Sequence, residues 1–178
     1  MNTRQLLKKL SKCPAGQDGW KEFEDICIKI LQALFVPPLS KPHIQSRTQS
    51  GTDRRDAIFP NRMRDHKNAW GLIHLDHEAK YIPFEFKNYD KQKVTKEDVE
   101  QIKNYLTSKF GRLAFLCTRT IPGKSAHIKR NAIYSEEKKI IIFLEPRHLI
   151  EMVDLKERGQ DPADLLLDLI DAFMFQHE

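Results

Sequence analysis

The chain has 178 residues, of which 40% are hydrophobic and 31% are charged, a length and composition suited to one domain with a sizeable core. It contains no run of about 18 apolar residues and no signal-peptide pattern, which excludes the membrane-spanning and secreted classes and leads us to expect a cytoplasmic protein. Its three cysteines, Cys13, Cys27 and Cys117, lack C-x-x-C spacing, so we expect reduced thiols rather than disulfides or a zinc site.

Positive charge is concentrated in the middle of the chain. Residues 1–39 carry a net charge of +2; residues 40–139 contain 21 basic and 12 acidic residues (+9); residues 140–178 contain 3 and 9 (−6), which gives +5 in total. Nucleic-acid phosphates would be attracted to the middle segment and repelled by the acidic tail. Surface charge that merely solvates the fold is the alternative.

Two helices are predicted first, an amphipathic one over residues 4–12 and a second from an N-cap at Asp18 to Phe35. The apolar stripe of the second helix consists of Trp20, Cys27, Ile28, Leu31 and Phe35. Glu24 lies in the middle of that stripe. Because a buried carboxylate needs a cation, a hydrogen-bond network or a raised pKa, Glu24 is a candidate functional residue. The alternative is an ion pair with a basic neighbour at the edge of the core.

Two strands, residues 43–49 and 54–59, are predicted on either side of a turn at residues 50–53. Asp56 lies within the second strand, beside Arg54 and Arg55, which are candidate nucleic-acid contacts. Asp53 competes for the same acidic role, but it lies in the turn, where an Asp commonly binds its own backbone. We therefore favour Asp56.

A helix is predicted over residues 68–79, and it contains His74, Asp76 and His77. This spacing could suggest a metal site, but a helix that carries a few polar residues explains it adequately.

The strand at residues 82–88 carries the main motif, Glu85-Phe86-Lys87. Since successive side chains of a strand point to opposite faces, Phe84 and Phe86 enter a core while Glu85 and Lys87 emerge together. If Asp56 approaches from a neighbouring strand, the site holds two oxygen ligands for a hard cation and a lysine that can orient or activate water. Metal-assisted phosphodiester hydrolysis requires these groups, and the leading hypothesis is therefore a nuclease.

The next helix begins with a capping box, in which Thr95 is the N-cap and Asp98 the third helical residue, with Val94 packed on Val99. Gln101 and Tyr105 follow one turn apart, on a flank that faces the end of the preceding strand, and Tyr105 is a candidate contact to nucleic acid. The alternative is that both are ordinary boundary residues.

Three lysines, Lys91, Lys93 and Lys96, follow the strand of the main motif. They are candidate contacts to nucleic-acid phosphates, and a solvated lysine-rich loop is the alternative.

The remaining elements complete one α/β domain without repeats. Strands are predicted at residues 113–118 and 139–144, and helices at residues 125–134, 149–158 and from Asp161-Pro162 onward. The last helix has a broad apolar face, which we expect to be core; a dimer or fusion-partner surface is the alternative.

In this order, the motifs resemble those of the PD-(D/E)xK, or restriction-endonuclease-like, nuclease superfamily, particularly its Mrr-like and RecB-like branches. Phe23-Glu24 resembles the F-E of the first helix, Asp56 the metal-binding Asp, Glu85-Phe86-Lys87 the E-x-K core, and Gln101 to Tyr105 the helix motif. The resemblance covers residues 18–120, and Arg55 stands where the family pattern has Pro, which leaves the choice between Asp56 and Asp53 open.

The resemblance implies a three-layer α/β fold, with a central mixed sheet flanked by helices, over a single domain of residues 1–178. It implies a prokaryotic, Mg²⁺-dependent endonuclease, with Mn²⁺ as a substitute, that acts on double-stranded DNA in restriction or anti-phage defence. Asp56 and Glu85 would bind the metal, and Glu24 would ligate a second ion or its water. Lys87 would position the attacking water and stabilise developing charge, and Gln101 would orient Lys87 or a phosphate. A homodimer, or a fused or associated sensor protein, is the expected partner.

Two other functions fit the same motifs. One is a catalytically inactive domain that binds nucleic acid or protein, which the intact E-x-K disfavours. The other is a DNA-repair or junction-resolving nuclease. No base-reading module is recognisable, so the sequence predicts neither a recognition site nor a methylation requirement.

Overall fold

A five-stranded mixed sheet organises the chain. The structure is a computed structural model that describes residues 2–47 and 54–177. The strands lie in the order β1 (His43–Arg47), β2 (Arg54–Pro60), β3 (Tyr81–Lys87), β4 (Leu113–Thr118) and β5 (Ile140–Leu144). The first three strands pair antiparallel, whereas β3, β4 and β5 pair parallel.

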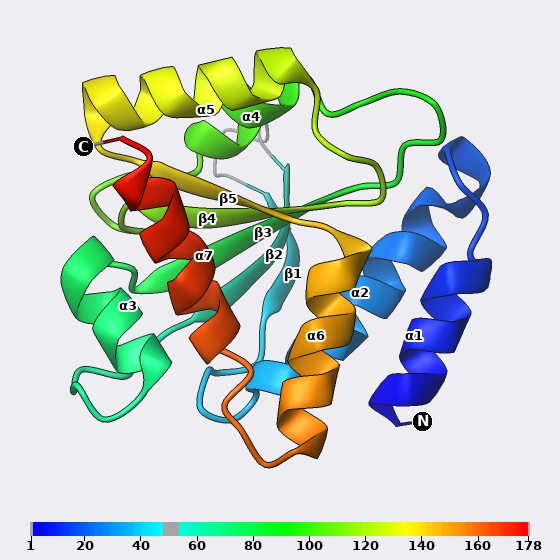
Figure 1. Cartoon of the computed structure of the whole chain (residues 1–178), viewed down its shortest axis with the longest axis horizontal. Helices are drawn as coiled ribbons and strands as arrows, with labels where there is room; N and C mark the ends of the chain where they lie inside the picture. Colours follow the sequence, from blue (N-terminus) through cyan, green and yellow to red (C-terminus); the bar gives the residue numbers. More distant parts are fainter. Residues whose placement is uncertain (1, 48–53, 178) are drawn as a thin grey trace.

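Helices cover both faces of this sheet (Figure 1). One face carries α4 (Lys96–Lys103) and α5 (Lys124–Glu137), which connect the parallel strands. The opposite face carries α1 (Thr3–Lys12), α2 (Trp20–Phe35), α3 (Ala69–His77), α6 (Pro146–Glu157) and α7 (Asp164–Phe175). Each face has its own hydrophobic cluster. The expected α/β class, with a mixed sheet flanked by helices, is confirmed.

The pattern of apolar residues in each strand matches the helices that cover it. Strands β4 and β5 are continuous apolar runs, and every residue in them is buried, because helices cover them on both sides. In β3 the side chains alternate as predicted. Phe84 and Phe86 join the larger cluster, on the side of α2, so Glu85 and Lys87 face the side of α4.

The start of α2 differs from the prediction. Asp18 does not cap the helix, because residues 17–19 form a 3-10 turn and Gly19 is the N-cap. A Cβ at Gly19 would lie 1.8 Å from the carbonyl oxygen of Pro14, so only glycine fits there. Trp20, predicted to lie in the buried stripe, is the first helical residue and is 47% exposed.

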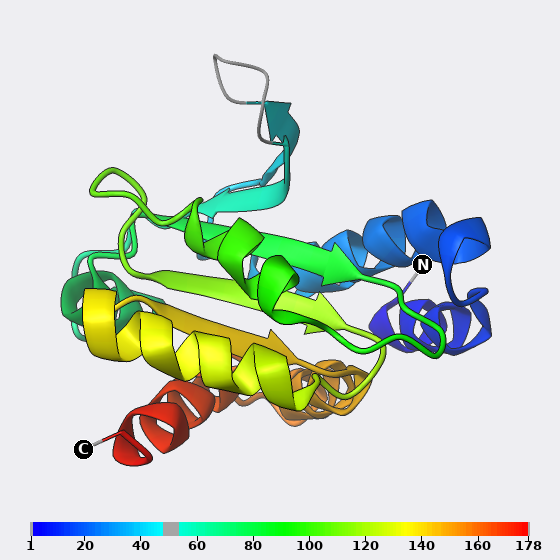
Figure 2. The ribbon, with the colours of Figure 1, turned by 90° about the horizontal axis from the view of Figure 1, so that it is seen from above.

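The other differences lie at the ends of elements. Strand β1 ends at Arg47, and the predicted turn with Asp53 lies outside the described residues. In Figure 2 the hairpin of β1 and β2 extends away from the rest of the sheet. Helix α6 begins at Pro146, three residues before the prediction, because Glu145 and His148 form a capping box.

The C-terminal helix α7 buries most of its apolar face within the larger cluster, as expected for core. Across the described residues, none of the helices combines the length and apolar character needed to cross a membrane.

Phe84 is the aromatic centre of the larger cluster and tests the packing of the sheet. It is fully buried, and its ring contacts those of Phe59 and Phe115 at centroid distances of 5.3 and 5.0 Å. We expect Phe84→Ala to lower the free energy of unfolding by about 3–5 kcal/mol, because it leaves a cavity. Phe175 is 76% exposed, so Phe175→Ala should change stability by less than about 0.5 kcal/mol in the same urea titration. Equal losses in the two variants would contradict this packing.

Candidate functional site

Asp56 and Glu85 lie next to each other on neighbouring strands. Ala57, which follows Asp56, pairs with Phe84, which precedes Glu85, in the antiparallel β2–β3 register. Asp56 Oδ2 accepts a hydrogen bond of 3.1 Å from the backbone N–H of Phe86. Glu85 is 3% exposed. The expected approach of Asp56 to the E-x-K strand is therefore present in the structure.

The two carboxyl groups share their site with the ammonium of Lys87. Burial, and then the charge of Asp56, raise the pKa of Glu85 from its ordinary value of 4.5 to about 8, although Lys87 and the Tyr105 hydroxyl offset part of this shift. The Oε2 atom of Glu85 is buried and has no hydrogen-bond partner among the described residues. An acceptor in such a place is costly unless a cation or a proton occupies it.

The ammonium of Lys87 is held by three oxygens. Its Nζ lies 3.2 Å from Oε1 of Glu85 and 3.4 Å from Oδ1 of Asp98, and it donates a hydrogen bond of 3.0 Å to Oε1 of Gln101. Burial alone would lower the pKa of Lys87, but the charges of Glu85 and Asp98 raise it above its ordinary value. Lys87 is therefore a charged donor at neutral pH rather than a base.

The start of α4 supplies most of this support. Asp98 completes the predicted capping box through the N–H and hydroxyl groups of Thr95. It also accepts a hydrogen bond of 2.7 Å from the Tyr89 hydroxyl and pairs with Lys87. Its contact with the site was missed, because a cap residue has an adequate local explanation in the sequence.

Gln101 and Tyr105 are placed as a pair, with the amide of Gln101 donating to the Tyr105 hydroxyl at 3.1 Å. Helix α4 ends at Lys103, so Tyr105 lies just beyond it. Tyr105 is only 1% exposed. Its hydroxyl therefore contacts Gln101 and Glu85 from the buried side of the site. Its burial argues against the expected contact with nucleic acid.

A second network, which the sequence did not indicate, fixes the end of β3. Asn88 is buried and donates hydrogen bonds to the carbonyl oxygens of Pro14 and Gly16. The guanidinium of Arg119 donates to Oδ1 of Asn88 at 2.8 Å and to the carbonyl oxygen of Cys13 at 2.7 Å.

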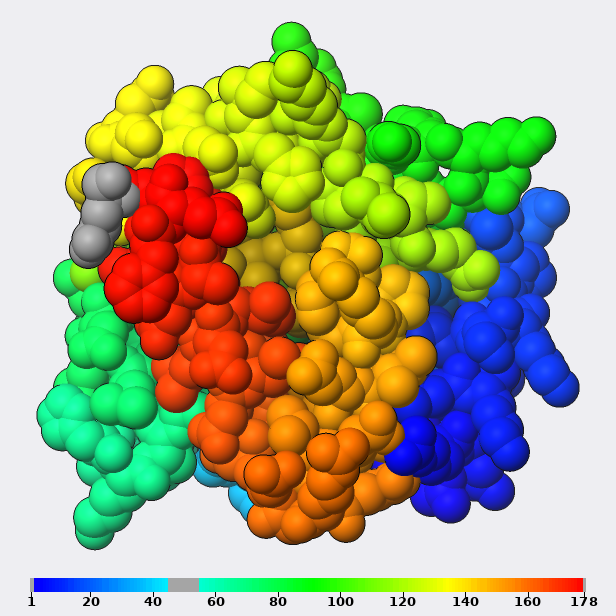
Figure 3. All heavy atoms as spheres, viewed as in Figure 1, coloured from blue at the N-terminus to red at the C-terminus, as the bar shows by residue number. Residues whose placement is uncertain are grey.

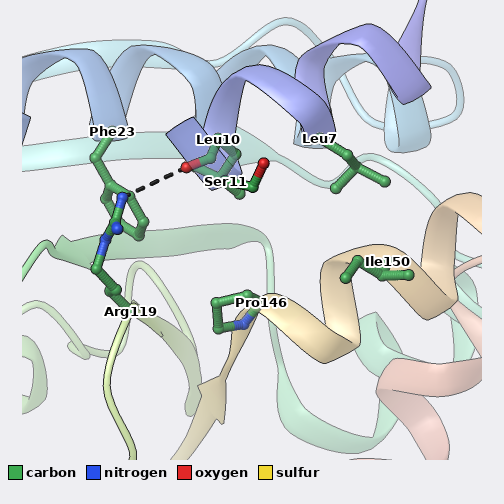
Figure 4. A pocket seen from close by; sticks show the side chains of 7 residues that line it. All are labelled: Leu7, Leu10, Ser11, Phe23, Arg119, Pro146 and Ile150. Atoms are coloured by element: carbon green, nitrogen blue, oxygen red, sulfur yellow. Dashed lines mark hydrogen bonds between the residues drawn. The ribbon is translucent and has the colours of Figure 1, made fainter. Parts of the chain in front are cut away.

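Arg119 is itself positioned from two sides. Its guanidinium lies over the ring of Phe23, where it lines a small apolar cavity and also reaches the Leu10 carbonyl (Figure 4). Its backbone N–H binds the carbonyl oxygen of Lys87 at 3.1 Å. The segment before α2 and the end of β3 are thus joined through one side chain.

Glu24 is buried at 2% exposure, as predicted. Its carboxylate pairs with Lys21 at 3.1 Å within α2, which corresponds to the ion-pair alternative. Helix α2 lies on the face of the sheet opposite α4. A role for Glu24 at a second metal ion stays a prediction.

The remaining candidate contacts are divided between surface and interior. Lys91, Lys93 and Lys96 are exposed on the loop after β3 and at the start of α4. The guanidinium of Arg55 packs over the ring of Phe110, 4.4 Å from its centroid, so one of its faces is occupied. Arg54 begins β2, and its side chain is outside the described part of the structure.

Within residues 2–47 and 54–177, no group of three or more His, Cys, Asp or Glu side chains is arranged to hold a metal ion. Asp56, Glu85 and Glu24 therefore do not form a three-carboxylate cluster. His74 in α3 belongs to the His74, Asp76 and His77 group, for which a metal site was considered. Its Nδ1 lies within hydrogen-bond distance, 3.1 Å, of the carbonyl oxygen of Asn61, which agrees with a structural role.

Comparison with known proteins gives one distant similarity. The chain is 27% identical over 169 residues to the "Putative transposon gamma-delta 80.3 kDa protein" of Escherichia coli (strain K12). The match covers 91% of this chain but 23% of that protein, so the chain spans about a quarter of the relative's length. No family model matches the chain, and no solved structure matches it.

The shifted pKa of Glu85 predicts a pH-dependent stability. Because its pKa is higher in the folded protein, the contribution of Glu85 is fully present below its ordinary value of 4.5 and is lost as the pH rises to about 8. In EDTA, we expect the free energy of unfolding of the wild type to fall relative to Glu85→Gln over this range, by on the order of a few kcal/mol.

Urea titrations at pH 5, 6, 7, 8 and 9 measure this difference. The exposed Glu136 provides the control, since Glu136→Gln should follow the wild type at every pH. A constant difference between the wild type and Glu85→Gln would show that Glu85 is an ordinary ionised carboxylate.

Proposed function

We propose that this chain is a metal-dependent endonuclease that hydrolyses DNA phosphodiester bonds and adopts a restriction-endonuclease-like fold. We further propose that it serves a prokaryotic restriction or anti-phage defence system. The observation that carries the proposal is the buried Oε2 atom of Glu85, which lacks a hydrogen-bond partner among the described residues and lies beside Asp56 and the charged Lys87.

The pair Asp56 and Glu85 fits a Mg²⁺ ion, for which Mn²⁺ can substitute. Mg²⁺ commonly keeps several waters and binds through one or two carboxylates together with phosphate oxygens of the substrate, so a third protein carboxylate is not required. A bound ion supplies Lewis-acid polarisation of a phosphoryl oxygen and lowers the pKa of a bound water. A cation here would also offset the repulsion that raises the pKa of Glu85.

The protein side chains divide the remaining work. Lys87, which stays protonated, donates to the oxygens on which negative charge develops during attack on phosphorus. Gln101 and Asp98 hold its ammonium at the mouth of the site, so the charge is in position before substrate binds. Lys91, Lys93 and Lys96 attract the phosphate backbone without reading its sequence.

Double-stranded DNA is the proposed substrate. The similarity to a protein named for a transposon, which is a DNA element, supports DNA over RNA. Because that protein is about four times as long as the matched region, we propose that this domain acts together with a fused or associated sensor, or as a homodimer.

Removal of either acid should abolish cleavage without unfolding the protein. Asp56→Ala and Glu85→Ala each remove a metal ligand, and each also relieves carboxylate repulsion, so the metal-free variants should be as stable as the wild type or more stable. Nicking of supercoiled plasmid with Mg²⁺, Mn²⁺ or EDTA measures activity, with linear duplex, single-stranded DNA and RNA as further substrates.

Asp53→Ala is the matched control and should cut normally. If Asp53→Ala is inactive and Asp56→Ala is active, the metal-binding aspartate is Asp53. If the wild type cuts none of these substrates with either metal, the nuclease proposal fails and a non-catalytic binding domain takes its place. A strong preference for branched DNA would instead identify a junction-resolving nuclease.

Lys87→Ala should separate cleavage from binding. We expect its single-turnover rate to fall by about 100-fold or more, because the lost group acts on the transition state, while its affinity for duplex DNA stays within a few-fold. Neutralising Lys91, Lys93 and Lys96 together should have the opposite effect. Binding should weaken for all sequences, and the slope of log affinity against log salt should become shallower by up to about 0.9 per lost phosphate contact.

Single-turnover cleavage and affinity for one duplex across a salt series measure both effects. Wild-type cleavage by Lys87→Ala would remove Lys87 from the mechanism. An unchanged salt slope in the triple variant would show that the three lysines are merely solvated.

A further inference from the structure

A cavity of about 460 Å³ lies beside Lys87, within the approximate 300–1,000 Å³ range of small-ligand sites. We propose that it binds one unpaired nucleotide of the substrate, with Trp20 as the stacking surface for the base. This inference rests on the proposed nuclease function and specifies its substrate class, namely DNA with an unstacked nucleotide next to the cleaved phosphate.

The cavity lies between two segments that are distant in the sequence. Gly16, Gln17 and Trp20 form one wall, and residues 86–92 at the end of β3 and in the following loop form the other. Figure 3 shows this loop (green) next to the N-terminal part of the chain (blue). Lys87 and Trp20 both line this cavity, so a nucleotide stacked on Trp20 would lie beside the end of β3 that carries Lys87.

Trp20 has the properties of a stacking surface. It is 47% exposed, whereas Trp70 is fully buried, and large aromatic side chains are normally buried for their hydrophobic area. Bases of any sequence stack on aromatic rings, because every base has a π-face. The ammonium of Lys21 lies 5.8 Å from the Trp20 ring centroid and pairs with Glu24 and Asp25.

The rim of the cavity offers groups for the edge of a base and for its phosphate. Gln17 and Gln92 are exposed and line this cavity. Amides supply both donors and acceptors, which suits the exposed edges of an unpaired base. Lys91 contributes a positive charge, and Asp90 is the acid among the residues that line this cavity.

The two walls are locked together before any ligand binds. Gly16 has φ +76°, which favours glycine, and its N–H binds the carbonyl oxygen of Asn88 at 2.8 Å. The Asn88 side chain returns two hydrogen bonds to this segment, and Arg119 fixes Asn88. The backbone of the two walls is therefore ordered before a nucleotide enters, which reduces the entropy cost of binding.

Tryptophan fluorescence tests the inference directly, because Trp70 is buried and Trp20 is the exposed reporter. The wild type in EDTA is titrated with single-stranded oligodeoxythymidine and, separately, with a blunt duplex. We expect quenching by the single strand, and Trp20→Leu should abolish the quenching and weaken single-strand binding by at least about fivefold, measured by anisotropy of a labelled oligonucleotide. Trp20→Phe should retain more of the affinity than Trp20→Leu.

Phe175→Leu, which alters an exposed aromatic residue elsewhere, should bind like the wild type. Equal single-strand affinity in the wild type and Trp20→Leu, or unchanged emission on binding, would overturn the inference. Cleavage of plasmid with Mg²⁺ is assayed in parallel, so the two proposals are separable. Cleavage without quenching overturns the nucleotide site alone. Quenching without cleavage overturns the nuclease and leaves a site that binds single-stranded nucleic acid.

Discussion

The close approach of two carboxyl groups, of which Glu85 is buried, constrains the rest of this structure. Asp56 and Glu85 lie side by side on β2 and β3, and the resulting repulsion, with burial, raises the pKa of Glu85 to about 8. The ammonium of Lys87 offsets only part of that cost. Such an arrangement persists in a folded protein when surrounding elements hold it, and here they hold it from both sides of the sheet.

The sheet topology itself places a helix where it can hold the Lys87 ammonium. Because β3 and β4 are parallel, the chain must cross over one face of the sheet between them, and α4 makes this crossing. The crossing helix begins over the face from which Lys87 emerges. Its cap residue Asp98 and, one turn later, Gln101 therefore reach the ammonium. A helix start that the fold requires thus also positions the ammonium of Lys87.

The features that sequence predicted are those fixed by local periodicity or capping. Alternation in β3 placed Glu85 and Lys87 on one face, and the Thr95 capping box located α4. Contacts between distant segments were not predictable in this way. Asn88 and Arg119 are 31 positions apart, and no pattern links them. The close approach of the Pro14 carbonyl to Gly19, which leaves no room for a side chain there, is likewise a contact that no local pattern shows.

The Arg119 network links the end of β3, which carries Lys87, to the segment before α2, which leads to Trp20. One side chain bonds to the segment before α2 and to Asn88, and its own backbone bonds to Lys87. The wall that carries Trp20 is therefore tied to the backbone of β3 at Lys87 and Asn88. None of these contacts involves Asp56 or Glu85, whereas the Lys87 ammonium itself pairs with Glu85. Separate sets of contacts therefore hold the cavity wall and the Lys87 ammonium, and of the two the ammonium is the one in contact with the acidic pair.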